Sequence, residues 1–137
     1  MRLRNIRGSK DVIASCPFVV QEPESCRGQW SGVFGNENPI HIEVGMGKGR
    51  FLMDMAALHP EINYVGIEMY DSVLLRAVQK REKLEEDLKN LFFIRMDARQ
   101  LPEVFAESEV DRIYLNFSDP WPKDRHAKWR LTSHEFL

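Results

Sequence analysis

The chain has 137 residues, 43% of them apolar, and a formal net charge of −2 at pH 7. This is enough apolar material for one compact core and hardly enough for two. No apolar run is long enough to cross a bilayer, and the basic stretch from Met1 to Lys10 has no apolar segment after it, so neither a membrane span nor a secretory leader is expected.

The cysteines and histidines do not form a recognisable metal motif. Cys16 and Cys26 are ten positions apart, and the chain has no CxxC or HxxxH spacing. We therefore expect reduced thiols, no metal ion and a cytoplasmic location. Basic residues gather near the N-terminus and again in residues 118–130, which favours an anionic partner there despite the small net charge.

Residues 1–39 contain several prolines and glycines without sustained periodicity, and we expect an arm that packs on a domain formed by residues 40–137. The domain begins with "IHIEV" (40–44), whose alternating β-branched residues end at a glycine and predict a strand. Apolar residues at helical spacing in "RFLMDMAALH" (50–59), followed by a proline, predict a helix. A second strand is predicted for "NYVGIE" (63–68).

A long helix is predicted to begin near Asp71, with the charged run "KREKLEEDLK" on its solvated face. Its expected apolar stripe comprises Leu74, Ala77, Val78, Leu84 and Leu88. Further strands are predicted for "LFFIRM" (91–96) and "DRIYLNF" (111–117), with a short helix around "LPEVF" (101–105) between them.

Strands that alternate with helices predict an α/β fold. Each crossover returns the chain to the same edge, so the strands pair in parallel and right-handed crossovers place helices on both faces. The sequence therefore predicts a doubly wound parallel sheet. Such sheets bind ligands beyond the carboxyl ends of their strands, which makes the residues after each strand the candidate site.

The first predicted strand leads into "EVGMGKG", which contains Glu43, Gly45, Gly47 and Gly49. Glycines permit a tight turn and let a ligand approach bare backbone. The spacing G-x-G-x-G differs from the G-x-G-x-x-G of dinucleotide-binding proteins. The acid before the first glycine suits a cationic ligand and would repel a pyrophosphate.

Acids also close the other predicted strands. Glu68 ends the second strand, where an acid commonly binds ribose hydroxyls. Asp97 and Ala98 follow the third strand and can bind an adenine amino group and ring nitrogen, while Asp119 follows the fourth. Taken singly, each acid is better explained by a structural role, as a surface residue of the strand for Glu43 and as a cap or a turn for the others. Together they fit S-adenosylmethionine, with its ribose, adenine and cationic tail, better than a nicotinamide dinucleotide.

In the segment "NFSDPWPKDRHAKWR" (116–130), an aspartate is followed by two prolines, one on each side of a tryptophan, and then by several cationic residues. With "EVGMGKG", "GIE" and "MDA", this segment resembles the bacterial tRNA (guanine-N7-)-methyltransferases, and the resemblance extends from "RLRN" through "FGNENPIHIEVG" to "LTSHEFL". It implies a Rossmann-like class I S-adenosylmethionine-dependent methyltransferase that methylates N7 of a guanine in the variable loop of tRNA.

The resemblance also implies roles for single residues. Asp119 matches the active-site acid of the family and Lys123 a substrate-contacting lysine. The cofactor-binding set comprises Glu43, Gly45, Gly47, Glu68, Asp97, Ala98, Asn116 and Asp119. The RNA-contacting set, after Lys123, comprises Arg125, His126, Lys128 and Arg130.

Members of the family continue past "LTSHEFL" with three more strands and a Thr-x-x-Glu segment that helps to hold the guanosine. We therefore expect a fold truncated after its fourth strand, in a monomer or a homodimer that covers the open edge. One alternative is an exocyclic amino methyltransferase, whose D/N-P-P-Y/F/W loop the "SDPW" segment partly resembles. Others are a catalytically incomplete fragment that binds only cofactor or RNA, and a nicotinamide-dependent oxidoreductase, which the glycine spacing disfavours.

Overall fold

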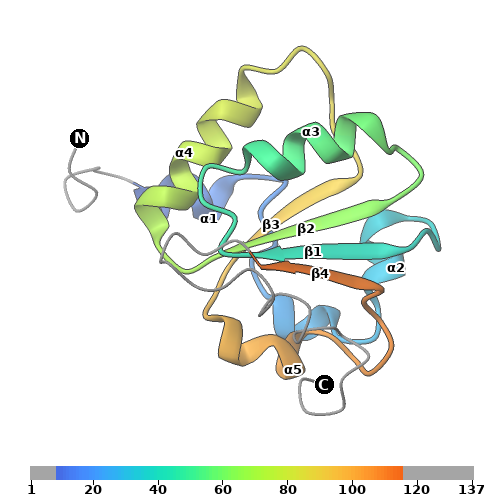
Figure 1. The fold of residues 1–137 in the computed structure, drawn as a ribbon. Coiled ribbons are helices and arrows are strands. Elements are labelled where there is room, and N and C mark those ends of the chain that lie inside the picture. Colours follow the sequence, from blue (N-terminus) through green and yellow to red (C-terminus); the bar gives the residue numbers. More distant parts are fainter. Residues whose placement is uncertain (1–8, 116–137) are drawn as a thin grey trace.

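A computed structural model describes residues 9–115 of the chain. In this part, parallel strands form one sheet in the order β3-β2-β1-β4 (Figure 1). The strands are β1 (Ile40–Val44), β2 (Asn63–Glu68), β3 (Leu91–Arg95) and β4 (Arg112–Leu115). The parallel pairing confirms the predicted doubly wound α/β class.

Helices cover both faces of this sheet (Figure 1). The first face is covered by α1 (Ser9–Ser15), α3 (Arg50–Leu58) and α4 (Asp71–Glu82), and the second by α2 (Trp30–Phe34) and α5 (Leu101–Val104). Short 3-10 turns form at Pro23–Cys26 and Ala98–Gln100. Successive side chains of a strand point to opposite faces, so β2 and β3 supply residues to both apolar cores, whereas the buried apolar residues of β1 and β4 lie in the core beneath α2 and α5.

The predicted long helix is shorter than its apolar stripe suggested. α4 ends at Glu82, so that Leu84 is exposed and Leu88 enters the core from the following loop. A longer helix would place the acidic run of that loop at the negative end of the helix dipole, which is unfavourable. Arg81 holds the loop instead, because its guanidinium donates to the carbonyl oxygens of Leu88 and Leu91.

The segment before β1 contacts both faces of the sheet, and its helices α1 and α2 were not predicted. Residues 18–20 run beside β3: the N–H of Val20 donates to the carbonyl of Phe93 at 2.8 Å, and the N–H of Phe93 donates to the carbonyl of Phe18 at 2.9 Å. On the other face, the indole N–H of Trp30 donates to the carbonyl of Val104 at 2.9 Å. These contacts join residues 9–34 to the sheet.

The two cysteines lie on opposite faces. Cys16 is buried in the core beneath α1, α3 and α4, whereas Cys26 packs against the core beneath α2 and α5. Both are free thiols, and burial raises the pKa of each.

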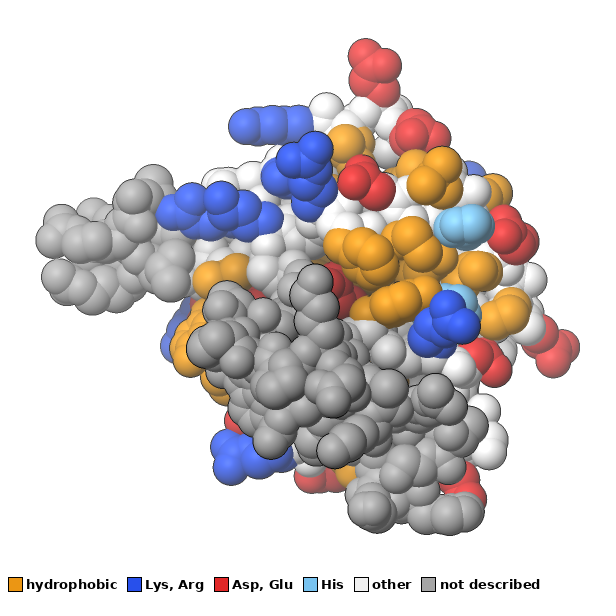
Figure 2. All heavy atoms as spheres, in the orientation of Figure 1, with side chains coloured by type: hydrophobic (Ala, Val, Ile, Leu, Met, Phe, Trp, Pro, Cys, Tyr) orange, Lys and Arg blue, Asp and Glu red, His pale blue; other side chains and the backbone are white. Residues whose placement is uncertain are grey.

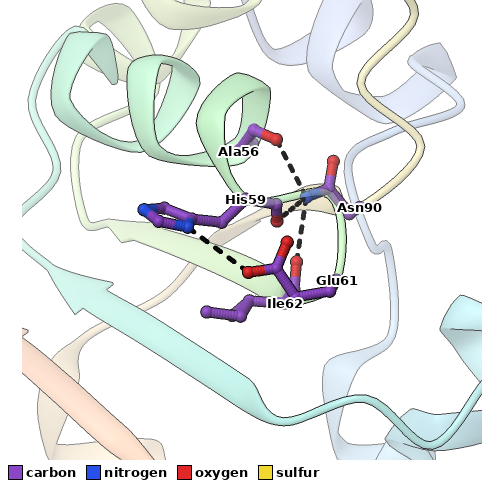
Figure 3. Close-up of polar contacts among 5 residues, drawn as sticks. All are labelled: Ala56, His59, Glu61, Ile62 and Asn90. Carbon is purple, nitrogen blue, oxygen red and sulfur yellow. Dashed lines mark hydrogen bonds and ion pairs between the residues drawn. The ribbon is translucent and has the colours of Figure 1, made fainter.

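Polar side chains close the edge of the sheet where the strands begin. The side-chain nitrogen of Asn90 lies 3.1, 3.1 and 2.9 Å from the carbonyl oxygens of Ala56, His59 and Ile62 (Figure 3). Asn90 precedes β3, so these bonds tie the end of α3 and its turn into β2 to the neighbouring strand. Glu61 lies 3.4 Å from the ring of His59 in the same turn.

Glu109 performs a similar task at the same edge. Its Oε1 accepts the N–H groups of Gly28 and Ala106 at 2.8 and 2.9 Å, and its Oε2 accepts the N–H of Trp30 at 3.0 Å. One carboxylate thereby joins the segment before α2 to the loop that leads into β4.

Candidate functional site

The connection between β1 and α3 folds closely over β2. The N–H groups of Gly45 and Met46 both donate to the carbonyl of Ile67, at 2.9 and 3.1 Å. Gly66 makes this approach possible, because a Cβ there would lie 2.2 Å from Sδ of Met46 and 2.8 Å from Cδ1 of Leu52. The turn is therefore fixed to the carboxyl end of the neighbouring strand.

Gly47 lies at the open part of this connection. Its φ of +60° belongs to the left-handed region, which residues with a Cβ rarely adopt. A Cβ built on Gly47 would find nothing within 4 Å. The half-buried backbone thus has open space on its Cβ side and is held in a conformation that suits glycine, as a close approach by a ligand requires.

Glu68 joins this turn to the connection after β2. Its side chain is buried, at 7% exposure for the residue. Oε1 accepts the N–H of Gly47 at 3.0 Å, and Oε2 accepts the N–H groups of Met69 and Tyr70 at 3.1 and 3.2 Å. An ionised carboxylate has about four acceptor sites, so these bonds leave room for one further donor, such as a ribose hydroxyl.

Asp97 caps the 3-10 turn that follows β3. Its carboxylate accepts the N–H of Arg99 at 2.9 Å and pairs with the Arg99 guanidinium at 2.8 Å. The side chain of Gln100 accepts the N–H of Asp97 in return, which completes a capping box. Hydrogen bonds from the Arg99 side chain and backbone lower the pKa of Asp97 to about 2, so the carboxylate is ionised at neutral pH.

Two of the four remaining predicted cofactor residues, Glu43 and Ala98, lie in the described part of the chain. The N–H of Met96 donates to the backbone carbonyl of Glu68 at 3.2 Å, so Asp97 and Ala98 begin beside the end of β2. Glu43 lies one residue inside β1, fully buried and in register with Gly66. It is therefore a residue of the sheet interior next to the site.

Seven predicted site residues lie outside the part of the chain that the structure describes. They are Asn116, Asp119, Lys123, Arg125, His126, Lys128 and Arg130.

The described residues fit the cofactor that the sequence predicted. Gly47 offers open backbone, Glu68 a fixed carboxylate with remaining acceptor capacity, and Asp97 an ionised one at the next strand end. These carboxylates are hydrogen-bond acceptors, and they suit hydroxyl and amino groups, which donate, and a cationic tail. The parts of the chain that the structure describes contain no group of three or more His, Cys, Asp or Glu residues placed to hold a metal ion.

Two neighbours of the site were missed in the sequence. Arg99 fixes the Asp97 carboxylate, and the D-x-R spacing of "MDAR" was the signal for it. Tyr70 lies beside Glu68 with 57% of its surface exposed. Its position two residues after the strand-end acid was the signal for a place beside the site.

Within residues 9–115, no helix has the length and apolar character that a membrane crossing requires.

Comparison with known proteins agrees with this geometry. Residues 37–137 match a family model described as a putative methyltransferase. The tRNA (guanine-N(7)-)-methyltransferase of Lachnoclostridium phytofermentans is 64% identical over 137 residues, which are 100% of this chain and 63% of that protein. The enzyme of the same name from Geobacillus thermodenitrificans is 52% identical over 138 residues, with the same two shares. The chain thus spans just under two thirds of the length of these relatives.

A solved structure also resembles the described fold. The antibiotic-resistance methyltransferase Kmr aligns with a TM-score of 0.55 and 25% identity, over 71% of this chain and 49% of that one. Together with the strand order, this likeness confirms the predicted Rossmann-like fold of class I methyltransferases.

Proposed function

Because the chain belongs to the putative methyltransferase family, we propose that it transfers a methyl group from S-adenosylmethionine to N7 of a guanine in tRNA. The observation that carries this proposal is the identity of 64% and 52%, over the whole chain, to two proteins named tRNA (guanine-N(7)-)-methyltransferase. These relatives favour it over an exocyclic amino methyltransferase. The variable loop as target, the cytoplasmic location and a monomeric or dimeric state stay predictions.

The described site supports cofactor binding by this chain. We assign the ribose hydroxyls to Glu68 and the adenine to Asp97 and the N–H of Ala98. Gly45 and Gly47 would form the floor, with Glu43 behind them. Backbone bonds fix the Glu68 carboxylate, and Arg99 fixes that of Asp97, so neither acid has to be ordered when the cofactor binds.

The proposed reaction depends mainly on alignment of the methyl group with the nitrogen that attacks it. When bound, S-adenosylmethionine supplies a methyl group on a cationic sulfur. Guanine N7 carries a lone pair and no proton at neutral pH, so the protein needs no strong base. Holding N7 in line can lower the barrier by about 7–11 kcal/mol.

We assign two further tasks to the segment that follows β4. The guanine becomes cationic as it accepts the methyl group, and a carboxylate at Asp119 would stabilise that charge and bind the Watson–Crick N–H groups. Pro120 and Pro122, next to it in the sequence, would restrict the backbone through their fixed φ. Lys123, with the cations that follow, would contact phosphates, which supply affinity and register without reading sequence.

The decisive experiment is transfer of labelled methyl to unmodified tRNA by the 137-residue chain, beside a full-length relative. We expect N7-methylguanosine, which is recognised by strand cleavage after reduction. Methyl groups on an exocyclic amine would favour the first alternative. Cofactor and tRNA binding without transfer, while the relative is active, would identify a catalytically incomplete fragment.

The role of Asp119 is tested by Asp119→Asn, with Asp124→Asn as the matched control in the same segment. Asp119→Asn should nearly abolish transfer, with a smaller loss of cofactor affinity, and the control should keep its activity. Turnover at the wild-type rate in Asp119→Asn would remove this residue from the mechanism.

A further inference from the structure

Exposed cations and large apolar side chains border Glu68 on the two connections that its carboxylate joins. We define this surface, the Glu68 rim, as Lys48, Arg50, Met69 and Tyr70. We propose that the Glu68 rim is a second RNA-contacting surface, in which Lys48 and Arg50 bind phosphates and Tyr70 stacks on an unpaired base. This inference rests on the proposed function and deepens it.

The placement of the rim follows from the bonds to one carboxylate. Gly47, which precedes Lys48, donates to Oε1 of Glu68 at 3.0 Å, and Tyr70 donates to Oε2 at 3.2 Å. The two backbone segments therefore meet across a single side chain. Since Glu68 also belongs to the predicted cofactor site, the rim borders that site on the side of β1 and β2.

The cations at this edge of the sheet divide into two kinds. Arg95 pairs with Asp71 at 2.9 Å and Arg99 with Asp97 at 2.8 Å. Lys48 and Arg50 are exposed and form no ion pair with any described residue. In Figure 2, Lys and Arg side chains gather over the amino end of α3 and the adjoining surface of α4.

The position of these two cations is unfavourable for the isolated fold. α3 begins at Arg50 and has no acidic residue in its first turn. The amino end of a helix carries partial positive charge, so a cation there is repelled. Phosphate groups would remove this repulsion, whereas S-adenosylmethionine, which is itself cationic, would not.

The apolar part of the rim is equally exposed. Tyr70 and Met69 are 57% and 43% exposed, although both follow a fully buried strand. Tyr70 is the N-cap residue of α4 and provides no side-chain cap, where Ser, Thr, Asp or Asn would. Cations beside an exposed aromatic ring are the combination that binds single-stranded RNA, through phosphates and stacked bases.

The test measures tRNA and cofactor affinity separately for the 137-residue chain. Fluorescence anisotropy with an unmodified tRNA transcript, at salt concentrations from about 50 to 200 mM, gives the affinity and its salt slope. Calorimetric titration with S-adenosylmethionine in the absence of RNA gives the cofactor affinity. The charge variant is Lys48→Gln with Arg50→Gln, and its control is Lys83→Gln with Lys89→Gln, which removes two exposed cations elsewhere.

We expect the charge variant to reduce the slope of log affinity against log salt by about 1.4–2, and the control to leave it unchanged. Tyr70→Ala should weaken tRNA binding about 5- to 150-fold, whereas Tyr70→Phe keeps the ring and should stay within about twofold. Cofactor affinity should stay near the wild-type value in every variant. Circular dichroism checks that Tyr70→Ala is folded.

Three outcomes would overturn the inference: no measurable tRNA binding by the wild-type chain, an unchanged slope in the charge variant, or cofactor affinity that falls as far as tRNA affinity in Tyr70→Ala. The last would make Tyr70 a wall of the cofactor site. Failure of the proposed function is distinguishable, because it would show as tRNA binding through the rim without methyl transfer by either the chain or the full-length relative.

Discussion

Glu68 and Glu109 form the same kind of hydrogen bonds at opposite ends of the strands, Glu68 where the strands end and Glu109 where they begin. Each carboxylate accepts three backbone N–H groups, and each joins two segments that are distant in sequence. Each also accepts from a glycine with positive φ, Gly47 or Gly28. A carboxylate that accepts several backbone N–H groups therefore has a structural role, and such bonds do not by themselves identify a ligand site.

The surroundings of the two acids differ. A Cβ on Gly28 would lie 3.9 Å from the Cβ of Ala106, whereas one on Gly47 would meet nothing within 4 Å. The bonds of Glu109 connect segments that pack around the buried Trp30. Those of Glu68 leave a glycine backbone open beside exposed cations. Open space at the strand ends, rather than the acid, marks the candidate site.

The largest effect should come from removing either acid. Glu68→Ala and Glu109→Ala each leave three backbone donors without their acceptor, and each should lower the free energy of unfolding by about 1–3 kcal/mol, more for the deeply buried Glu68. Only Glu68→Ala should weaken S-adenosylmethionine binding, by about tenfold or more. Urea unfolding and calorimetry measure the two quantities. Equal loss of cofactor affinity in both variants would contradict the assignment of the cofactor site to Glu68 alone of the two acids.

A smaller effect is expected at the two glycines. Gly47→Ala and Gly28→Ala force a Cβ into the left-handed region without a close contact, so each should destabilise the fold by about 1–2 kcal/mol. Gly47→Ala should also reduce cofactor affinity, because its methyl group projects into the open space. If Gly28→Ala reduced that affinity as much, the loss would reflect general destabilisation.

A gain in stability is expected from Arg50→Gln. Removing a cation from the first turn of α3 should raise the free energy of unfolding by about 0.3–1 kcal/mol at low salt. Lys89→Gln, in the loop before β3, should leave it unchanged. A loss of stability in Arg50→Gln would mean that this arginine stabilises the fold, and it would remove the argument that its position favours phosphate binding.

The smallest effect on stability at neutral pH is expected for Asp97→Asn, because the Asp97–Arg99 pair lies at the surface. The contribution of the Asp97–Arg99 pair to stability should become measurable at acidic pH. The folded pKa of about 2 is below the usual value near 3.9, so the carboxylate stabilises the fold above that value and loses its contribution as the pH falls towards 2. The stability difference between wild type and variant should therefore shrink between about pH 4 and 2, with Asp54→Asn as control. NMR titration of the Asp97 carboxyl carbon tests the pKa directly, and a midpoint near 3.9 would contradict the ion pair.

The sequence predicted the sheet well. Strands 40–44 and 63–68 agree with β1 and β2, and 91–96 and 111–117 differ from β3 and β4 by one residue where the structure describes them. The reason is that buried parallel strands are short and apolar, and a glycine or an acid stands within two residues of the ends of β1, β2 and β3. The strand-end positions of Gly47, Glu68 and Asp97 followed from this alone.

Features that depend on contacts distant in sequence were not predicted. α1 and α2 are too short for a periodicity signal, and the side chains that they bury, Ile13 and Trp30, belong to the two cores on either face of the sheet. The end of α4 depends on Arg81, whose carbonyl partners lie seven and ten residues further on. Likewise, nothing local in the sequence indicates that Glu68 reaches across to Gly47.

The placement of Cys16 and Cys26 sets how the protein responds to oxidants. The sheet stands between the two sulfur atoms, so a disulfide within one molecule would require the layers to separate. Oxidation could then link only different molecules, and it would begin at the partly exposed Cys26. A non-reducing gel should therefore show covalent dimers and no faster-migrating monomer, and Cys26→Ser should remove the dimers.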